Sequence, residues 1–334
     1  MDNDRPIFVV GCPRSGTTML QLMLHAHPRI AIPPETRFLL EGYRERRRFG
    51  DLTNPGNRRR LAEWIVRRKQ SRFDDLSLDP ETVISEIVDG PPTLGSAVGA
   101  VFRAYARRFD KPRWGDKRPA YIAHLDVILR LFPTAQIINI TRDGRDCVSS
   151  LKEMSWHKRG VPAAAAAWAR AVDRAAEAAR SLPAATYHQL RYEDLVSDPE
   201  TSLRAICEFL DEPYDPAMTE PAKVAKIAVP KHKTWHQRTH QAVSTARVQS
   251  WRSRLTPTEL GLCETTLRRR LAVNGYPPAE PDASSRPKTG DLLRYRIEVA
   301  RHDLGRLRRA ARHTVDRWTG AAPVEDQRTT TFRR

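Results

Sequence analysis

One stretch near the start of this 334-residue chain constrains its fold more than any other. Ile7–Val10 are β-branched and aromatic residues, so they predict a short buried strand. A loop with Gly11 and Gly16 at its ends follows, and apolar residues at helical spacing predict a helix over 17–26. In such a strand, loop and helix, backbone N–H groups point at one place, and the helix dipole favours an anion there. The stretch therefore predicts an α/β fold with a phosphate-binding loop.

The loop matches the Walker A pattern only in part. Gly11 and Gly16 have the required spacing, but Thr17 stands where that pattern has its Lys. No side chain from that position can pair with β- and γ-phosphates, and the positive charge lies inside the loop at Arg14. A P-loop-like nucleotide kinase or NTPase remains an alternative here, although it needs that Lys and a carboxylate for Mg²⁺.

Alternating helices and strands predict a P-loop-like central parallel β-sheet flanked by helices. Residues 36–110 carry many charges and little strand signal, so we expect a helical insertion that covers the sheet and helps to form a binding pocket. Residues 111–119 are predicted to be a loop. An extended piece is predicted at 30–32, strands at 136–141 and 186–191, and helices at 120–131, 142–155, 162–180, 199–210 and 257–273.

The C-terminal part follows a different pattern. We expect one α/β domain over 1–278, a Pro- and Ser-rich linker over 279–289, a basic amphipathic helix over 290–319 and a disordered tail over 320–334. Apolar residues in the helix recur at steps of three and four and are flanked by arginines. The helix could pack on its own domain, form a homodimer, or associate with a membrane surface.

The formal net charge of +17 leaves three partners open: nucleic acid, an anionic membrane, or a small polyanionic ligand. The chain lacks zinc-finger spacing and RNP-like aromatic motifs, so no nucleic acid is expected, although a non-catalytic basic nucleotide- or nucleic-acid-binding protein stays an alternative. The four cysteines are widely separated, and a His-rich basic loop at 228–245 has no acidic partner, so no metal is expected. The absence of long apolar runs and of a leader predicts a cytoplasmic chain.

A second motif follows the predicted strand at 136–141. Arg142 stands at the strand end, and Ser150 lies eight residues later on the predicted helix. An Arg offers a bidentate, charge-assisted fork to a phosphate, and a Ser two turns into the helix can add a hydroxyl donor. The pair is suited to bind a phosphate, but the motif alone fits equally a capped helix start with local salt bridges.

These motifs together resemble the sulfotransferase family that includes bacterial enzymes and the protein-tyrosine sulfotransferases. The resemblance covers most of residues 6–273 and implies transfer of a sulfuryl group from PAPS (3′-phosphoadenosine 5′-phosphosulfate) to a hydroxyl or amine, with PAP as product. The motifs that carry it are Val10–Thr18, Pro34–Arg37, Trp114–Pro119, Arg142–Asp146, Tyr192–Val196 and Trp251–Leu255.

The resemblance also implies roles for individual residues. Glu35 matches the proposed base, Lys117 matches a residue that stabilises the transferring charge, and Tyr192 matches an aromatic residue near the nucleotide. Arg142 and Ser150 match the residues that hold the 3′-phosphate. The 5′-phosphosulfate is expected on the first loop, at Arg14, Ser15, Gly16, Thr17 and Thr18. Arg14 also belongs to the expected catalytic set, since sulfuryl transfer relies on positioning and electrostatics.

The chain departs from the family pattern in two places. Met154 stands where the tyrosine enzymes have a further nucleotide-binding Arg, and Ser250 stands where the late loop often has a basic residue, so that Arg247 or Arg252 can take its place. If Glu35 were not the base, His25 or His27 would be the next candidates. The acceptor stays open: a small molecule, a glycan, a lipid or a peptide tyrosine. Peripheral membrane association is also left open.

Overall fold

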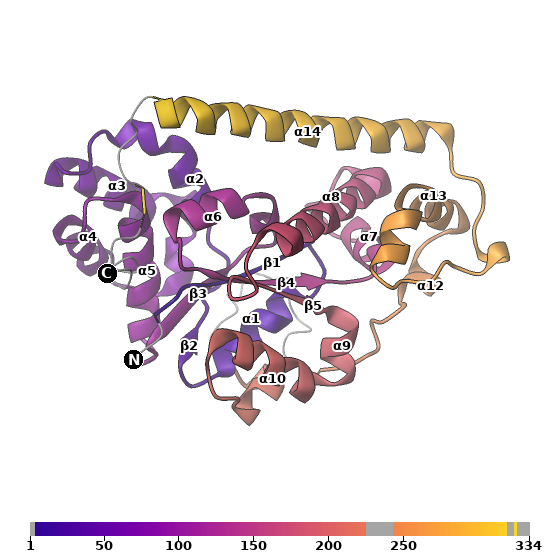
Figure 1. Ribbon diagram of the computed structural model, residues 1–334, viewed down its shortest axis with the longest axis horizontal. Helices are drawn as coiled ribbons and strands as arrows, with labels where there is room; N and C mark the ends of the chain where they lie inside the picture. Colours follow the sequence, from indigo (N-terminus) through magenta and orange to yellow (C-terminus); the bar gives the residue numbers. More distant parts are fainter. Residues whose placement is uncertain (1–3, 225–242, 319–323, 326–334) are drawn as a thin grey trace.

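A computed structural model describes residues 4–224, 243–318 and 324–325. Within these residues five parallel strands form one sheet in the order β2-β3-β1-β4-β5 (Figure 1). This confirms the predicted P-loop-like α/β fold. The strands are β1 Ile7–Gly11, β2 Ile30–Ala31, β3 Arg113–Lys117, β4 Gln136–Thr141 and β5 Tyr187–Arg191.

The central strands are buried on both faces. Phe8 and Val10 of β1 face one apolar cluster, whereas Ile7 and Val9 face the other. This alternation follows from the period of two in a β-strand. Helices therefore have to cover both sides of the sheet, as is usual for parallel sheets.

Figure 1 shows α1, α9 and α10 below the sheet, and α6, α7 and α8 above it. The α-helices are α1 Thr17–Ala26, α2 Phe38–Glu45, α3 Pro55–Arg67, α4 Pro80–Asp89, α5 Leu94–Arg107, α6 Leu125–Leu131, α7 Gly144–Lys152, α8 Gly160–Ser181, α9 Tyr192–Ser197, α10 Pro199–Leu210, α12 Trp251–Arg254, α13 Pro257–Val273 and α14 Thr289–Trp318. The 3₁₀ turns are η1 Arg46–Phe49, η2 Lys69–Ser71, η3 Phe73–Leu76, η4 Pro119–Ala123, η5 Pro216–Thr219 and η7 Pro281–Ala283.

The prediction of a loop over 111–119 was wrong, because β3 lies there, between β1 and β2. Its residues lack the apolar character of a central strand, yet all five are buried. Arg113 is held by Glu212 at 3.3 Å, by Gln136 Oε1 at 2.6 Å and by the Leu210 carbonyl at 2.7 Å. Partners that lie far away in the sequence thus allow a strand with charged residues to be buried. A local sequence pattern cannot predict such partners.

Residues 36–110 contain α2, α3, α4 and α5 and lie beside the β2–β3 edge of the sheet (Figure 1). Helix α5 is the most buried of the four, and its Phe102 stacks on Trp114 of β3 at 5.2 Å between ring centroids. Most of 320–334 lies outside the described residues. Val324 is buried, and its carbonyl accepts a hydrogen bond of 2.7 Å from the Gly95 N–H.

Helix α14 runs along the upper edge of the molecule in Figure 1 and packs on α8. The packed face contains Leu292, Tyr295 and Glu298, and Glu298 pairs with Arg159. The apolar line seen in the sequence is on another face and is exposed, at Leu293, Ile297, Leu304 and Leu307. The helix therefore packs on its own domain, as one of the three readings of the sequence predicted, but through a different face from the apolar line.

The carboxyl ends of the strands lie at one edge of the sheet. Val9 pairs with Lys117 across β1 and β3, and Gly11 pairs with Ile140 across β1 and β4. Thr141 pairs with Arg191 across β4 and β5. This register brings the first loop, Lys117, Arg142 and Tyr192 to the same edge, where parallel α/β sheets bind ligands.

Candidate active site

The first loop has a strained conformation that only some residues tolerate. Arg14 has φ 74° and Gly16 has φ 103°, both in the left-handed region. A Cβ on Gly16 would lie 2.6 Å from the Tyr192 ring, so a larger residue cannot fit there. Strain of this kind at a non-glycine residue persists only where the surrounding structure fixes it. Ser15 is turned inward, and both its N–H and its hydroxyl donate to the Cys12 carbonyl, at 3.1 and 2.7 Å.

The two predicted phosphate-binding motifs meet. Arg14 Nε donates to Ser150 Oγ at 2.9 Å, and Arg142 Nη1 donates to the Arg14 carbonyl at 3.2 Å. Burial, and next the charge of Arg142, lower the pKa of Arg14. A half-buried and a buried cation so close together favour an anion beside them.

Arg142 is held from several sides. Its Nη2 donates to the Arg247 carbonyl and lies 3.4 Å from Asp146 Oδ2, and its guanidinium lies over the Tyr192 ring at 4.4 Å from the centroid. Burial alone lowers the pKa of Arg142, but nearby anionic groups, led by Asp146, outweigh it and raise the pKa. The Nε of Arg142 is buried with no hydrogen-bond partner among the described residues.

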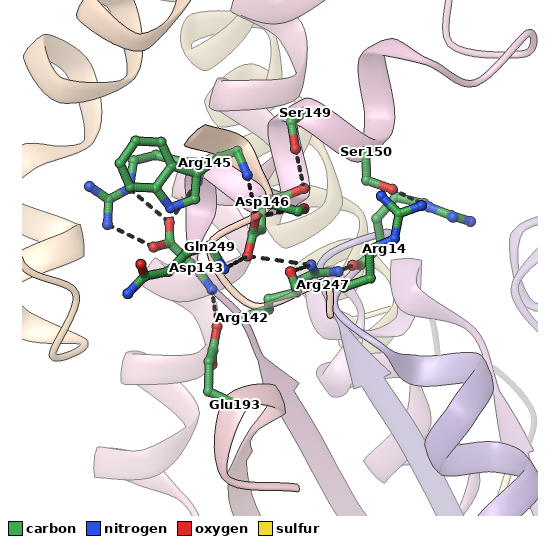
Figure 2. A network of polar contacts seen from close by, with 12 residues as sticks. Arg14, Arg142, Asp143, Arg145, Asp146, Ser149, Ser150, Glu193, Arg247 and Gln249 are labelled. Atoms are coloured by element: carbon green, nitrogen blue, oxygen red, sulfur yellow. Dashed lines mark hydrogen bonds and ion pairs between the residues drawn. The ribbon is translucent and has the colours of Figure 1, made fainter. Parts of the chain in front are cut away.

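Asp146 joins this motif to a segment about a hundred residues later (Figure 2). It is fully buried and accepts hydrogen bonds from the Gln249 N–H at 3.0 Å, the Ser250 hydroxyl at 3.0 Å and the Trp251 N–H at 2.8 Å. The loop before α12 is thereby fixed over Arg142. Neither the motif nor the spacing in the sequence indicated this role.

Trp168 of α8 supports the same turn. Its Nε1 donates to the Arg142 carbonyl at 2.8 Å, and its ring lies so close to Gly144 that a Cβ there would be 2.7 Å away. The glycine at the start of α7 is therefore required by this close approach.

A pocket with a volume of about 780 Å³ opens at this edge of the sheet. Of the predicted site residues, Arg14, Gly16, Thr17, Thr18, Glu35, Lys117, Arg142 and Tyr192 line it. Ser15 does not, and Ser150 reaches the site through its hydrogen bond to Arg14. Of the two late-loop candidates, Arg247 lines the pocket, whereas Arg252 is exposed and bonds Gln249.

Lys117 connects the loop to Glu35. Its Nζ lies 3.3 Å from Thr18 Oγ1 and 3.5 Å from Glu35 Oε2, and the side chain is nearly fully buried. Arg118 Nε lies 4.0 Å from Glu35 Oε1. Glu35 is therefore a partly exposed carboxylate between two cations, next to the first turn of α1.

Asp116 is fully buried next to Lys117 at the end of β3. It accepts hydrogen bonds from the Tyr121 hydroxyl, from the Lys117 N–H at 2.8 Å and from Thr36 Oγ1 at 3.4 Å. Burial raises the pKa of Asp116 to about 6, although these hydrogen bonds act in the opposite direction. The carboxyl group positions the strand end and the residue after Glu35.

The wall near Glu35 is cationic. Arg37, Arg72 and Arg118 all line the pocket. Arg37 Nε and Arg118 Nη1 are buried and have no hydrogen-bond partner among the described residues. Arg72 comes from the helical segment and carried no sequence signal, since its left-handed φ of 61° and its position depend on the packing of η2 and η3.

The alternative bases lie elsewhere. His25 Nδ1 accepts the Ile32 N–H at 3.2 Å, and burial, then the charge of Lys111, lowers the pKa of His25 to about 3. His27 contacts the Pro213 carbonyl at 2.8 Å. Neither lines the pocket. In the described part of the chain no group of His, Cys, Asp and Glu could hold a metal ion; most of the His-rich loop 228–245 lies outside it.

A sequence profile of the sulfotransferase family matches residues 6–216. The chain belongs to the sulfotransferase family. The match includes the first loop, Glu35, Lys117 and the Arg142 motif. It ends before the segment that Asp146 holds.

Relatives and solved structures agree with this assignment. The chain is 27% identical to the protein-tyrosine sulfotransferase of Drosophila melanogaster over 64% of its own length and 39% of the relative's. It is 26% identical to protein-tyrosine sulfotransferase 1 of Danio rerio over 86% and 77% of the two lengths. It thus spans less than half of the Drosophila relative.

The sulfotransferase domain of the Synechococcus PCC 7002 olefin synthase has a similar structure. The TM-score is 0.55 at 27% identity, over 81% of this chain and 97% of that domain. The sulfotransferase domain of the curacin biosynthetic pathway has the same fold, with a TM-score of 0.55 at 20% identity, over 84% and 100% of the two chains.

Proposed function

We propose that this chain transfers a sulfuryl group from PAPS to a hydroxyl or amine of an acceptor, with Glu35 as general base. The observation that carries the proposal is that one pocket is lined by both cationic phosphate motifs, which contact each other, and by the paired Glu35 and Lys117. Family membership supports sulfuryl transfer in general. The donor, the base and the acceptor are our own inferences.

The residues of the pocket fit a nucleotide with two anionic groups, a 3′-phosphate and a 5′-phosphosulfate. Arg142 has a buried Nε without a partner, and the Ser150 hydroxyl lies beside Arg14, so a 3′-phosphate would find donors there. The first turn of α1 has no side-chain cap, so its backbone N–H groups are available to a 5′-phosphosulfate. The Tyr192 ring would border the nucleotide.

The residues near Glu35 suggest how the transfer is catalysed. Glu35 takes the proton from the acceptor oxygen or nitrogen as it attacks sulfur, and the bond from sulfur to the 5′-phosphate oxygen breaks. Lys117 and Arg14 stabilise the charge on the sulfuryl oxygens and on the leaving phosphate. Thr18 and Glu35 hold the Lys117 ammonium between donor and acceptor. No metal ion is needed for these roles.

The acceptor site is cationic, since Arg118 lies 4.0 Å from Glu35, and Arg37 and Arg72 line the same pocket. Acceptors that carry a carboxylate, phosphate or sulfate near the reacting group are therefore favoured. Small molecules, glycans and lipids of this kind fit, and so does a tyrosine in an acidic peptide, in keeping with the names of the protein-tyrosine relatives. A cytoplasmic location remains a prediction.

Two measurements test the proposal. Calorimetric titration should show that PAP binds much more tightly than AMP and without Mg²⁺. Incubation with ³⁵S-labelled PAPS and a cell-extract metabolite library should then yield a labelled product. Equal affinities for PAP and AMP would show that the pocket has no binding site for the 3′-phosphate. Mg²⁺-dependent ATP binding would favour the kinase or NTPase alternative, and salt-dependent nucleic-acid binding without turnover would favour the binding-protein alternative.

A further inference from the structure

Four of the six large hydrophobic side chains that are exposed in the described part of the chain lie on α14, and the proposed catalytic function does not use them. Leu293 is 59% exposed, Ile297 43%, Leu304 55% and Leu307 61%. They recur at steps of four, seven and three, so together they follow one side of the helix for about 21 Å. Ala300, at the remaining position of this pattern, is also exposed. Apolar patches of this kind usually mark an interaction surface.

Another face of α14, near the start of the helix, packs on its own domain. Leu292 and Tyr295 pack against the main core, and the Tyr295 hydroxyl contacts the Thr266 carbonyl at 3.5 Å. Glu298 is buried and pairs with Arg159 of the loop before α8. One face thus holds the helix in place, so the exposed line is presented outward on a fixed element.

Arginines flank the exposed line. The side chains of Arg294 and Arg301 are 76% and 63% exposed, although each also reaches an acidic residue, Asp291 at 3.8 Å and Glu298 at 3.4 Å. Arg296 is exposed on the other side of the line. Over Thr289–Trp318 the sequence holds eight arginines against four acidic residues. The line is therefore apolar in the middle and cationic at its borders.

We propose that this face of α14 docks on an anionic membrane surface. Apolar side chains would enter the boundary between headgroups and acyl chains, and the flanking arginines would contact lipid phosphates. The helix would then lie flat between the sulfotransferase domain and the bilayer. None of the helices in the described ranges is suited to cross a membrane, so the contact is peripheral.

A second copy of the chain fits the same face less well. If the line were a coiled-coil seam, Leu293, Ala300 and Leu307 would take d positions and Ile297 and Leu304 would take a positions. Arg294 and Arg301 would then be e positions, and Arg296 a g position. In a parallel pair Arg296 would face Arg301 of the other copy, although the next g position, Asp303, is acidic. In an antiparallel pair the e positions Arg294 and Arg301 would face each other. Both arrangements bring like charges together, whereas an anionic surface neutralises them.

The experiment is co-sedimentation of the full chain with vesicles. We expect binding to vesicles that contain phosphatidylglycerol, little binding to pure phosphatidylcholine, and weaker binding as salt is added. Arg294→Gln and Arg301→Gln should each lower the partition coefficient about fivefold. The double variant Ile297→Asp and Leu304→Asp should lower it by tenfold or more.

Matched controls separate this face from general effects. Val273→Asp changes an exposed apolar residue of α13, and Arg204→Gln changes an exposed arginine of α10; neither should alter vesicle binding. Since the changed residues lie outside the pocket, PAP affinity should stay the same in every variant, which also reports folding. The proposal is wrong if the wild-type chain does not bind anionic vesicles. It is also wrong if sedimentation velocity shows a wild-type dimer that dissociates in the double variant.

Discussion

We call the part of the pocket around Arg14 and Arg142 the donor end, and the part around Glu35 and Lys117 the acceptor end. The two parts hold their side chains in different ways. At the donor end Arg142 and Asp146 are buried, and each bonds several groups from separate elements. At the acceptor end Glu35 is partly exposed, and its contacts with Lys117 and Arg118 are long, at 3.5 and 4.0 Å. Buried donors without partners among the described residues occur at both ends, on Arg142 as well as on Arg37 and Arg118.

This difference follows from the elements that build each end. The donor end is made from β1, β4 and the loops that follow them, which the sheet fixes. The acceptor end includes Arg37 and Arg72 from the helical segment beside the sheet. We therefore expect donor-end substitutions to act on nucleotide affinity and acceptor-end substitutions to act on turnover.

The largest effect is expected for Arg142→Ala at the donor end. Removal of a charged partner of a buried phosphate should cost about 2–5 kcal/mol of PAP affinity and little AMP affinity. The two nucleotides should then bind with similar constants in a calorimetric titration. Arg14→Ala is the matched control, and it should weaken both nucleotides while the preference for PAP remains. A preference that survives in Arg142→Ala would place the 3′-phosphate elsewhere.

The second effect concerns Asp116, which supports the acceptor end. Since burial raises its pKa to about 6, the folded chain keeps a proton that the unfolded chain has released between about pH 4 and pH 6. The stability from this group is therefore present below pH 4 and lost as the pH rises through 6. Between pH 4 and pH 7, the free energy of unfolding of Asp116→Asn should therefore rise by about 3 kcal/mol relative to that of the wild type.

Urea unfolding of both proteins at the two pH values measures this difference. A constant loss from altered hydrogen bonding in the variant cancels, because only the change with pH is compared. The same change with pH in both proteins would mean that Asp116 titrates normally.

Glu35→Gln should lower kcat about a hundredfold or more, because the acceptor loses its base. The affinity for PAP should stay within about twofold, since Glu35 contacts the pocket at the other end from Arg142. Initial rates with labelled PAPS and titration with PAP measure the two quantities. Near-normal turnover in the folded variant would exclude Glu35 as the base.

Asp146→Asn should have the smallest effect of the four. The amide oxygen can still accept from the Ser250 hydroxyl and the Trp251 N–H, but the NH2 group cannot accept from the Gln249 N–H or pair with Arg142. PAP should therefore bind about tenfold more weakly, or about 1.4 kcal/mol. AMP affinity should not change, because AMP lacks the 3′-phosphate. If both nucleotides weaken equally, Asp146 serves the fold in general and does not position Arg142.

The sequence predicted the parts of the site that depend on local patterns. The strand, loop and helix at 7–26 and the strand with Arg142 at its end lie where they were expected, and Arg14 and Ser150 are in contact. Strand β3 was missed, because charged residues can be buried only with partners such as Glu212, which lie far along the chain. Asp146 was missed for the same reason, whereas Arg72 was missed because its position depends on the packing of η2 and η3.

The outward line on α14 shows a different limit. The periodicity of the sequence predicted the apolar line that is exposed. The helix carries a second stripe of apolar residues, and only packing against the domain decides which stripe faces α8. The choice of Leu292 and Tyr295 for the inner stripe depends on Thr266 and Arg159, and neither is local in sequence.

The hydrogen bonds to Asp146 also bear on how the chain is made. Arg142 is synthesised long before Gln249–Trp251, the residues that cover it. A nascent chain on the ribosome can form β1, β4 and the first loop while this cover is still missing. The proposed nucleotide site is therefore completed late in translation. A chain truncated before residue 249 would keep both predicted phosphate motifs but lack the contacts that hold Arg142 in its final position.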